Sequence, residues 1–218
     1  MIKIKSISEV KSHLSGLRAV IFDLDDTLYS EKEYVRSGFA AVAALLCEVE
    51  DAQGKLWSFF ERGESAIDAL LLSEGIYSDE QKALCLAEYR SHAPLIHLYE
   101  GARDLLLELR REGYLVGLIT DGRPDGQRAK IHALALDGVI DEIIVTDELG
   151  GAEYRKPCAS AFELMRERLS ARSGSEISYA EMCYVGDNTA KDFIAPDSLG
   201  MRSILFDNPD GIYNKNFG

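Results

Sequence analysis

Short apolar runs that stop abruptly at clusters of polar residues are the feature that most limits the fold of this chain. Four of them are Arg18–Asp26 (RAVIFDLDD), Leu115–Gly122 (LVGLITDG), Ile143–Glu148 (IIVTDE) and Met182–Asn188 (MCYVGDN). A fifth run, SILFD, covers Ser203–Asp207. Runs this short and this rich in Val, Ile and aromatic residues are typical of buried β-strands.

Helical patterns lie between these runs. Apolar residues recur at helical spacing from Ala102 to Leu109, and Gly113 then ends the pattern. A second pattern runs from Cys158 to Leu169 after Pro157, a residue that suits the first turn of a helix. Strands that alternate with helices form parallel sheets covered on both faces. We therefore expect an α/β fold with a doubly wound parallel sheet.

Polar side chains fall at the carboxyl ends of the predicted strands, where open parallel sheets bind their ligands. These residues are Asp23, Asp25, Thr120 and Asp187. Their convergence predicts one functional site at this edge of the sheet.

The stretch from residue 30 to residue 98 breaks the alternation, because it contains no convincing strand. Val35, Phe39, Val42, Leu46 and Val49 have the spacing of an amphipathic helix, and LWSFF, SAIDALLL and EQKALCLAEYR are further helical pieces. We expect a core domain of residues 1–29 and 99–218, with an all-helical domain of residues 30–98 inserted after the first strand. The first fifteen residues are expected to form a short helix.

Composition excludes several classes of partner. The 218 residues carry 37 Asp and Glu against 24 Lys and Arg, a formal net charge of -13, which argues against binding to nucleic acid. The N-terminal segment is too polar for a signal peptide, and no apolar run approaches the roughly 18 residues of a membrane span. The four cysteines are widely spaced and form no zinc motif, which favours reduced thiols and a cytoplasmic protein.

Carboxylates dominate the predicted site. Asp23 and Asp25 stand two residues apart, so they can face one site from an extended segment, and they repel each other unless a cation or a proton intervenes. Asp187 and Asp192 add two acids in GDNTAKD, although an Asp in a first helical turn is also ordinary helix chemistry. Carboxylate oxygens without His or thiolate partners suit a hard cation such as Mg²⁺.

Groups that can bind an anion lie beside these acids. Thr120 offers a hydroxyl, Lys156 offers a positive charge, and the turn at Asp121-Gly122 leaves backbone N–H groups free to surround a phosphate. The sequence therefore predicts an anion-binding site beside the acidic cluster.

The four segments FDLDDTL, LITDG, RKP and VGDNTAKDF, in this order, resemble the motifs of the haloacid dehalogenase-like hydrolase superfamily. The matches extend from residue 20 to about residue 193. The resemblance implies a Rossmann-like core, and the helical insertion is similar to the family's first type of cap domain.

The resemblance also implies roles for individual residues. Asp23 would be the nucleophile, and Asp25 would protonate the leaving oxygen and then activate water, with its backbone carbonyl on Mg²⁺. Asp23, Asp187 and Asp192 would hold the metal, the last directly or through water. Thr120, Asp121, Gly122 and Lys156 would form the phosphate site, and Thr27 would brace the loop.

Several functions compete with a phosphatase of small phosphorylated metabolites. A phosphomutase shares the same core. A 2-haloacid dehalogenase lacks the second acid and the metal, so Asp25 and Asp187 argue against it, and a phosphonate hydrolase lacks the second acid as well. A non-enzymatic phospho-signalling module would be shorter and would lack the insertion.

The leaving group is less determined than the chemistry. A sugar phosphate is favoured over a nucleoside 5'-monophosphate, because the insertion shows no obvious aromatic pair for stacking a base. The oligomeric state is undetermined. Candidate residues for reading the leaving group, each expected to be exposed, are Tyr29, Tyr34, Arg36, Arg62, Arg90, His92 and Arg123.

Overall fold

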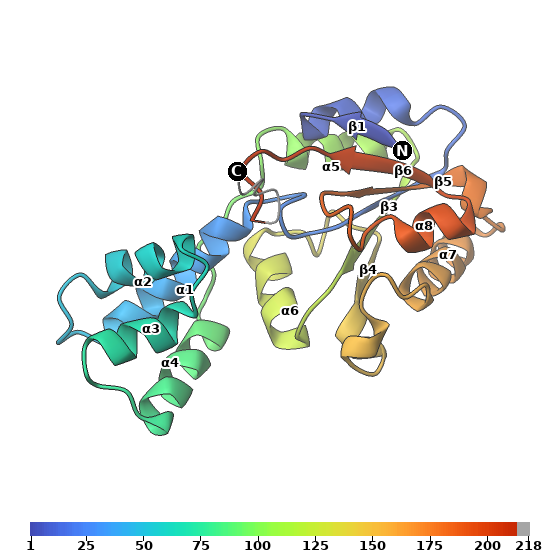
Figure 1. The fold of residues 1–218 in the computed structure, drawn as a ribbon. Helices are drawn as coiled ribbons and strands as arrows, with labels where there is room; N and C mark the ends of the chain where they lie inside the picture. Colours follow the sequence, from blue (N-terminus) through green and yellow to red (C-terminus); the bar gives the residue numbers. More distant parts are fainter. Residues whose placement is uncertain (213–218) are drawn as a thin grey trace. The chain divides into compact units, whose positions relative to one another are not determined.

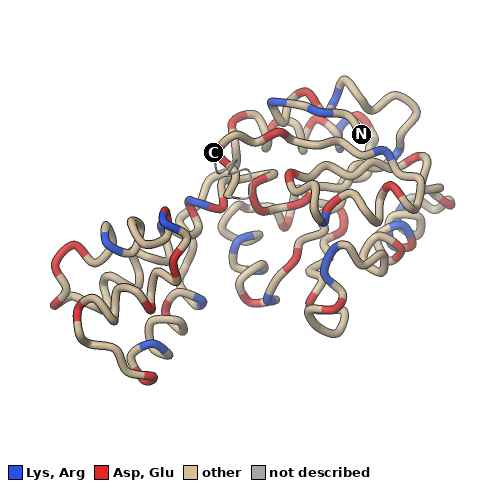
Figure 2. The backbone as a smooth tube through the Cα atoms, in the orientation of Figure 1, with Lys and Arg blue, Asp and Glu red and all other residues tan. Residues whose placement is uncertain are grey.

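The computed structural model describes residues 1–212, and these residues divide into two compact units (Figure 1). The larger unit contains Met1–Glu31 and the chain from His97 onward, and the smaller unit is Lys32–Ile96. The sequence had suggested limits at 30 and 98. Figure 2 shows acidic residues spread along the chain in both units, interspersed with Lys and Arg.

The larger unit is built on one six-stranded sheet of order β1-β6-β5-β2-β3-β4, in which every pairing is parallel. This confirms the predicted α/β class. The strands are β1 (Ile2–Ile4), β2 (Ala19–Phe22), β3 (Leu115–Thr120), β4 (Glu142–Val145), β5 (Met182–Gly186) and β6 (Arg202–Phe206).

Helices cover both faces of this sheet (Figure 1). Those of the larger unit are α5 (Ala102–Arg111), α6 (Pro124–Ala133), α7 (Ser160–Ser173) and α8 (Ile194–Leu199), with short 3-10 helices at Ile7–His13, Thr146–Leu149, Ala152–Tyr154 and Tyr179–Glu181. Ala19 and Ile21 of β2 face a buried cluster that includes Phe162 and Met165 of α7. Because side chains alternate along a strand, Val20 and Phe22 point to the opposite face, where both are fully buried.

Two details of the larger unit correct the sequence analysis. The first fifteen residues form strand β1 before a 3-10 helix, Ile7–His13, so the helical insertion follows the second strand, β2, and not the first. A strand of three residues is too short to give a readable alternation. Helix α7 begins at Ser160, so Pro157 precedes the helix; the backbone N–H of Cys158 instead donates to the carbonyl of Arg155 in a turn, at 2.9 Å.

The smaller unit contains helices and no strand between residues 32 and 96. The helices are α1 (Glu31–Leu45), whose first residue belongs to the larger unit, α2 (Ala52–Glu61), α3 (Ala66–Ser73) and α4 (Asp79–Ser91). Val42, Leu56 and Leu70 are fully buried in its core. The ring of Tyr89 packs against Gly38, where an added Cβ would lie 2.5 Å from two ring carbons, so this crossing requires a glycine.

Two further observations concern the whole described chain. All four cysteines carry free thiols, as expected. Within residues 1–212, none of the helices combines the length and the apolar character that crossing a membrane requires.

Candidate active site

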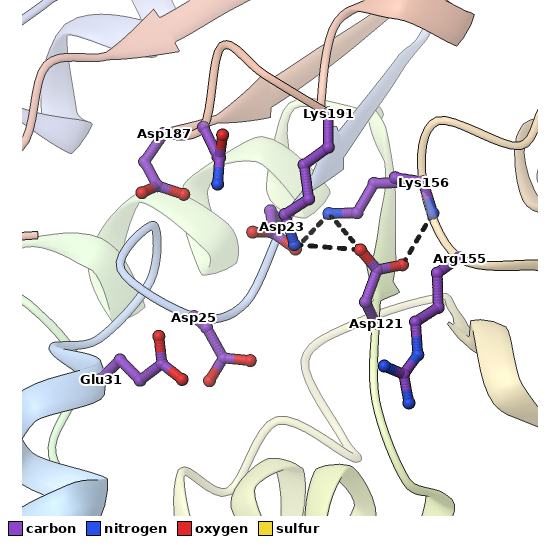
Figure 3. A pocket seen from close by; sticks show the side chains of 9 residues that line it. Asp23, Asp25, Glu31, Asp121, Arg155, Lys156, Asp187 and Lys191 are labelled. Carbon is purple, nitrogen blue, oxygen red and sulfur yellow. Dashed lines mark hydrogen bonds and ion pairs between the residues drawn. The ribbon is translucent and has the colours of Figure 1, made fainter. Parts of the chain in front are cut away.

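The carboxyl ends of the three central strands, β5, β2 and β3, meet at a pocket of about 330 Å³ in the larger unit (Figure 3). The chain passes from β2 to β3 on one side and later returns to β5 on the other. This point of divergence is where open α/β sheets bind ligands. The pocket is lined by Asp23, Asp25, Glu31, Asp121, Arg155, Lys156, Asp187, Asn188 and Lys191.

Asp23 follows β2 directly and is almost completely buried beside Lys156. The Lys156 ammonium lies 2.6 Å from a carboxylate oxygen of Asp23 and 2.8 Å from one of Asp192, and it donates to the hydroxyl of Tyr184 at 2.7 Å. Burial alone would lower the pKa of Lys156, but the charges of Asp192 and Asp23 raise it well above its ordinary value. The lysine is therefore a fixed positive charge at the base of the pocket.

Asp23, Asp187 and Asp192 each place one carboxylate oxygen within 4.8 Å of the others. Burial raises the pKa of Asp187 to about 8, and repulsion from Asp23 and Asp192 adds to the effect. Burial likewise raises the pKa of Asp23 to about 7, against the lowering effect of the Lys156 charge. A bound cation would relieve this repulsion, and a donor set of oxygen atoms alone fits a hard divalent ion such as Mg²⁺.

Asp25 is turned away from this acidic group and is held by three donors. One of its oxygens accepts from the Lys130 ammonium at 2.7 Å and from the hydroxyl of Tyr29, and the other accepts from the Gln127 amide at 2.9 Å. Burial by itself would raise the pKa of Asp25, but the charge of Lys130 and these hydrogen bonds lower it below its ordinary value. The Asp25 side chain is 22% exposed and lines the pocket.

Asp121, which follows β3, connects the two lysines of the pocket. One of its oxygens accepts from the backbone N–H of Lys156 at 3.0 Å, and the other lies 3.0 Å from the Lys191 ammonium. Burial alone would raise the pKa of Asp121, but the charges of Lys156 and Lys191 lower it. Arg155, also in the lining, donates two hydrogen bonds to Asp147, at 2.7 and 2.6 Å.

The structure brings most of the predicted site residues to the pocket, but three of them are not part of its lining. Asp23, Asp25, Asp121, Lys156 and Asp187 line it. Asp192, Thr120 and Gly122 do not: Asp192 is fully buried against Lys156, and the Thr120 hydroxyl accepts from the Gln127 amide. Thr27, predicted as a brace, donates to Asp187 at 3.4 Å.

Several residues of the site are not predicted by the sequence patterns above. Lys191 lies inside the segment GDNTAKD, whose two acids are predicted site residues. Gln127 and Lys130 are three residues apart in α6, a spacing that puts both on one helix face just after the TDG turn. That spacing predicts a shared helix face, but it does not reveal the contact with Asp25. No sequence pattern predicts that Glu31, Arg155 and Asn188 line the pocket.

The residues considered for reading the leaving group divide between core and surface. Tyr29, Tyr34 and His92 are buried, which corrects the expectation that they are exposed. Within the smaller unit, the rings of Tyr34 and His92 lie 5.0 Å apart and the Arg36 guanidinium stacks over Trp57 at 4.2 Å. Exposed members of the set are Arg36, Arg62, Arg90 and Arg123.

The amino-acid sequence of the chain is similar to those of several phosphatases. The chain is 24% identical over 201 residues to glyceraldehyde 3-phosphate phosphatase of Methanothermobacter thermautotrophicus, covering 87% of this chain and 85% of that protein. It is 25% identical over 210 residues to ribulose-1,5-bisphosphate 5-phosphatase of Halopiger xanaduensis, covering 87% and 84%.

Among solved structures, the fold resembles that of the HAD-hydrolase YfnB of Bacillus subtilis bound to magnesium, with a TM-score of 0.62 and 23% identity over 92% of this chain and 90% of that one. The model of the haloacid dehalogenase-like hydrolase family matches residues 17–200. Because this match covers most of the chain and includes every motif of the site, the protein belongs to the haloacid dehalogenase-like hydrolase family.

Proposed function

We propose that this chain is a Mg²⁺-dependent phosphatase that hydrolyses small phosphomonoesters through an aspartyl-phosphate on Asp23. The observation that carries the proposal is the placement of Asp23. Its carboxylate is buried at the carboxyl end of a central strand, lines the pocket, lies 2.6 Å from the Lys156 ammonium, and forms an acidic cluster with Asp187 and Asp192. A nucleophilic carboxylate needs such a setting to approach a phosphate dianion.

In the first proposed step, a carboxylate oxygen of Asp23 forms a bond to phosphorus. The bond between phosphorus and the leaving oxygen breaks, and its electron pair goes to the leaving oxygen. Asp25 must take up a proton before this step, although the charge of Lys130 lowers its pKa. It then gives the proton to that oxygen, so the alcohol departs neutral and Asp25 becomes a carboxylate.

In the second step, water attacks the phosphorus of the aspartyl-phosphate. Asp25 takes the proton from the water, the bond between phosphorus and the Asp23 oxygen breaks, and the Asp23 carboxylate is restored together with inorganic phosphate. Asp25 is therefore an acid in one step and a base in the next, which its position in the lining of the same pocket permits.

The carboxylates of Asp23, Asp187 and Asp192, with the backbone carbonyl of Asp25, are proposed to hold Mg²⁺. When bound, the ion supplies positive charge that offsets the negative charge of the phosphoryl oxygens. Lys156 and Lys191 lie in the same pocket and add cationic charge from this chain itself. Asp192 restrains Lys156 from the buried side, which keeps the ammonium directed at Asp23.

The phosphate site is proposed to form from Thr120, Asp121, Gly122 and Lys156. Gly122 has φ 134, a left-handed conformation that favours glycine and turns the backbone sharply after β3. Asp121 contributes by ordering the two lysines. The smaller unit is proposed to be the cap domain that selects the leaving group.

We further propose that the substrate is a small sugar phosphate. Phosphatases of phosphorylated sugars are among the similar proteins. The pocket lining also contains Glu31, whose pKa burial and the nearby Asp25 charge raise to about 8. Near neutral pH such a carboxyl group is mostly protonated, and it can donate a hydrogen bond to a hydroxyl-bearing leaving alcohol. A nucleoside 5'-monophosphate phosphatase and a phosphomutase are the alternative functions.

Turnover of a panel of phosphorylated metabolites by the purified protein, with release of phosphate as the readout, tests this proposal. We expect the protein to hydrolyse sugar phosphates with a kcat/KM above that for nucleoside monophosphates. If nucleoside monophosphates exceeded the sugar phosphates by about tenfold, a difference of 1.4 kcal/mol, the substrate assignment would be replaced. Absence of phosphate release from every member would contradict the phosphatase function itself.

A further inference from the structure

Helix α6 directs two buried polar side chains, Gln127 and Lys130, at Asp25. The Lys130 side chain is only 7% exposed. An ammonium in such a place is costly unless it is paired, and lysines are among the residues least often buried. Its ammonium lies 2.7 Å from a carboxylate oxygen of Asp25 and 6.0 Å from the centre of the Tyr29 ring. Helix α6 is therefore joined to Asp25 by a largely buried ion pair.

Both oxygens of the Asp25 carboxylate are engaged by this arrangement. Lys130 and the Tyr29 hydroxyl share one oxygen, while the Gln127 amide donates to the other at 2.9 Å. A carboxylate with donors on both oxygens has little freedom to rotate. Its orientation in the pocket is consequently set by side chains outside the segment DLDDT that carries it.

Gln127 extends the connection to a second strand. Its amide nitrogen donates to Asp25 and also to the hydroxyl of Thr120, the last residue of β3. Gln127 thus links Asp25, which is proposed to transfer the proton, to Thr120, which is proposed to bind phosphate. Gln127 is itself buried, so this link is protected from competing water.

We propose that Lys130, assisted by Gln127, is a positioning residue that holds the Asp25 carboxyl group in the orientation needed for proton transfer at the leaving oxygen. This inference rests on the proposed phosphatase function. A general acid must lie within hydrogen-bond reach of the atom it protonates, and a displacement of about 1 Å can cost about 100-fold in rate. Neither Lys130 nor Gln127 is among the residues that line the pocket, so both act through Asp25.

The dependence of kcat/KM on the leaving group separates this role from a purely structural one. An alkyl leaving group needs protonation, whereas nitrophenolate departs readily without it. For Lys130→Met we expect kcat/KM to fall by roughly 100-fold with an alkyl phosphate such as glycerol phosphate, but by less than about 5-fold with nitrophenyl phosphate. Gln127→Met should show the same preference with a smaller loss.

Two further variants complete the experiment. Lys130→Arg keeps the charge and the donors, and it should recover most of the activity toward the alkyl phosphate. Lys11→Met removes a partly exposed lysine that pairs with Glu108 and Glu112 outside the pocket lining, and it should match the unsubstituted protein with both esters. Equal losses with both esters in Lys130→Met, or no loss at all, would overturn the positioning role.

Crystal structures of the unsubstituted protein and of Lys130→Met test the same inference without any turnover. We expect the Asp25 carboxylate to leave its position in the variant while the sheet and Asp23 stay in place. An unmoved Asp25 would overturn the inference whatever the kinetics show. If instead the unsubstituted protein hydrolysed no phosphate ester, the proposed function would fail, and the two structures would still decide whether Lys130 positions Asp25.

Discussion

Lys156 shows how single residues define this site. Its ammonium is fully buried, yet it lies between the carboxylates of Asp23 and Asp192 and donates to the Tyr184 hydroxyl. Burial of one charge is costly, and burial of opposite charges in contact is tolerated. The lysine and its partners therefore depend on one another, and the nucleophile proposed here is held by charge as well as by the backbone of β2.

Substitution of the proposed nucleophile is the first prediction at this scale. Asp23→Asn keeps the shape of the side chain but removes the negative charge that attacks phosphorus. We expect kcat to fall by at least ~1,000-fold, because a covalent step cannot occur without its nucleophile. Circular dichroism should show a folded protein. Near-normal turnover in this variant would mean that water attacks the substrate directly.

The raised pKa of Asp187 gives a prediction about stability and pH. A carboxyl group whose pKa is about 8 in the folded protein and 3.8 in the unfolded chain keeps its proton to a higher pH when the protein is folded. As pH rises through this interval, Asp187 ionises freely in the unfolded chain but not in the metal-free folded state. The free energy of unfolding therefore falls. Asp187→Asn lacks this effect.

Thermal unfolding in the presence of a chelator checks this expectation. The difference in Tm between Asp187→Asn and the unsubstituted protein should shift in favour of the variant by about 2 °C or more between about pH 5 and about pH 8.5. Asp104→Asn, at an exposed position in α5, serves as the control and should show no such trend. A Tm difference that is independent of pH would contradict the predicted proton binding at Asp187.

At the scale of helices and strands, the crossing of α1 and α4 depends on the absence of a side chain at Gly38. An alanine in the middle of a helix usually stabilises it by about 1 kcal/mol relative to glycine. Here the new Cβ would lie 2.5 Å from the Tyr89 ring. We expect Gly38→Ala to lower the free energy of unfolding by about 1–3 kcal/mol instead, because the ring must move.

Urea unfolding measures this change. Ala40→Gly, at an exposed position two residues further along α1, is the matched control and should lose about 1 kcal/mol through helix propensity alone. If Gly38→Ala were more stable than the unsubstituted protein, the close packing of Tyr89 on α1 would be wrong.

The elements also show how much of the fold and of the site the sequence could predict. The strands β2, β3 and β5 are readable because each is an apolar run that stops at polar residues, and the same strand ends predict Asp23, Thr120 and Asp187 as site residues. Strand β1 was missed because three residues give too short a pattern. Helix α6 is not predicted as part of the site, because its buried face is polar. Gln127 and Lys130 bind Asp25, which lies about 100 positions earlier in the chain, and no local pattern reveals such a contact.

On the scale of the whole molecule, the chain combines the family fold with a pocket that holds more acids than bases, an excess that a bound divalent cation would offset. The pocket lining holds the acids Asp23, Asp25, Glu31, Asp121 and Asp187 against the bases Arg155, Lys156 and Lys191. The net charge of -13 leaves the surface acidic. A polyanionic substrate is repelled by such a surface, while a small phosphate ester needs only the local cations and the proposed metal ion.

Removal of the metal gives a prediction for the whole enzyme. Exhaustive chelation should abolish phosphatase activity, and Mg²⁺ should restore it. Ca²⁺ should inhibit in the presence of Mg²⁺, because its larger and more variable coordination shell misplaces the phosphoryl group. Full activity after chelation, measured with phosphate release, would show that the carboxylates of Asp23, Asp187 and Asp192 serve another purpose.

The covalent intermediate is the central claim, and trapping it is the most direct test. The protein is mixed with a substrate carrying a labelled phosphate, quenched in acid within the first turnover, and digested for mass spectrometry. The account predicts the label on the peptide containing Asp23, no label in Asp23→Asn, and a longer-lived label in Asp25→Asn, where water is activated poorly. Turnover of the substrate without any label on Asp23, or with the label on another residue, would contradict the account.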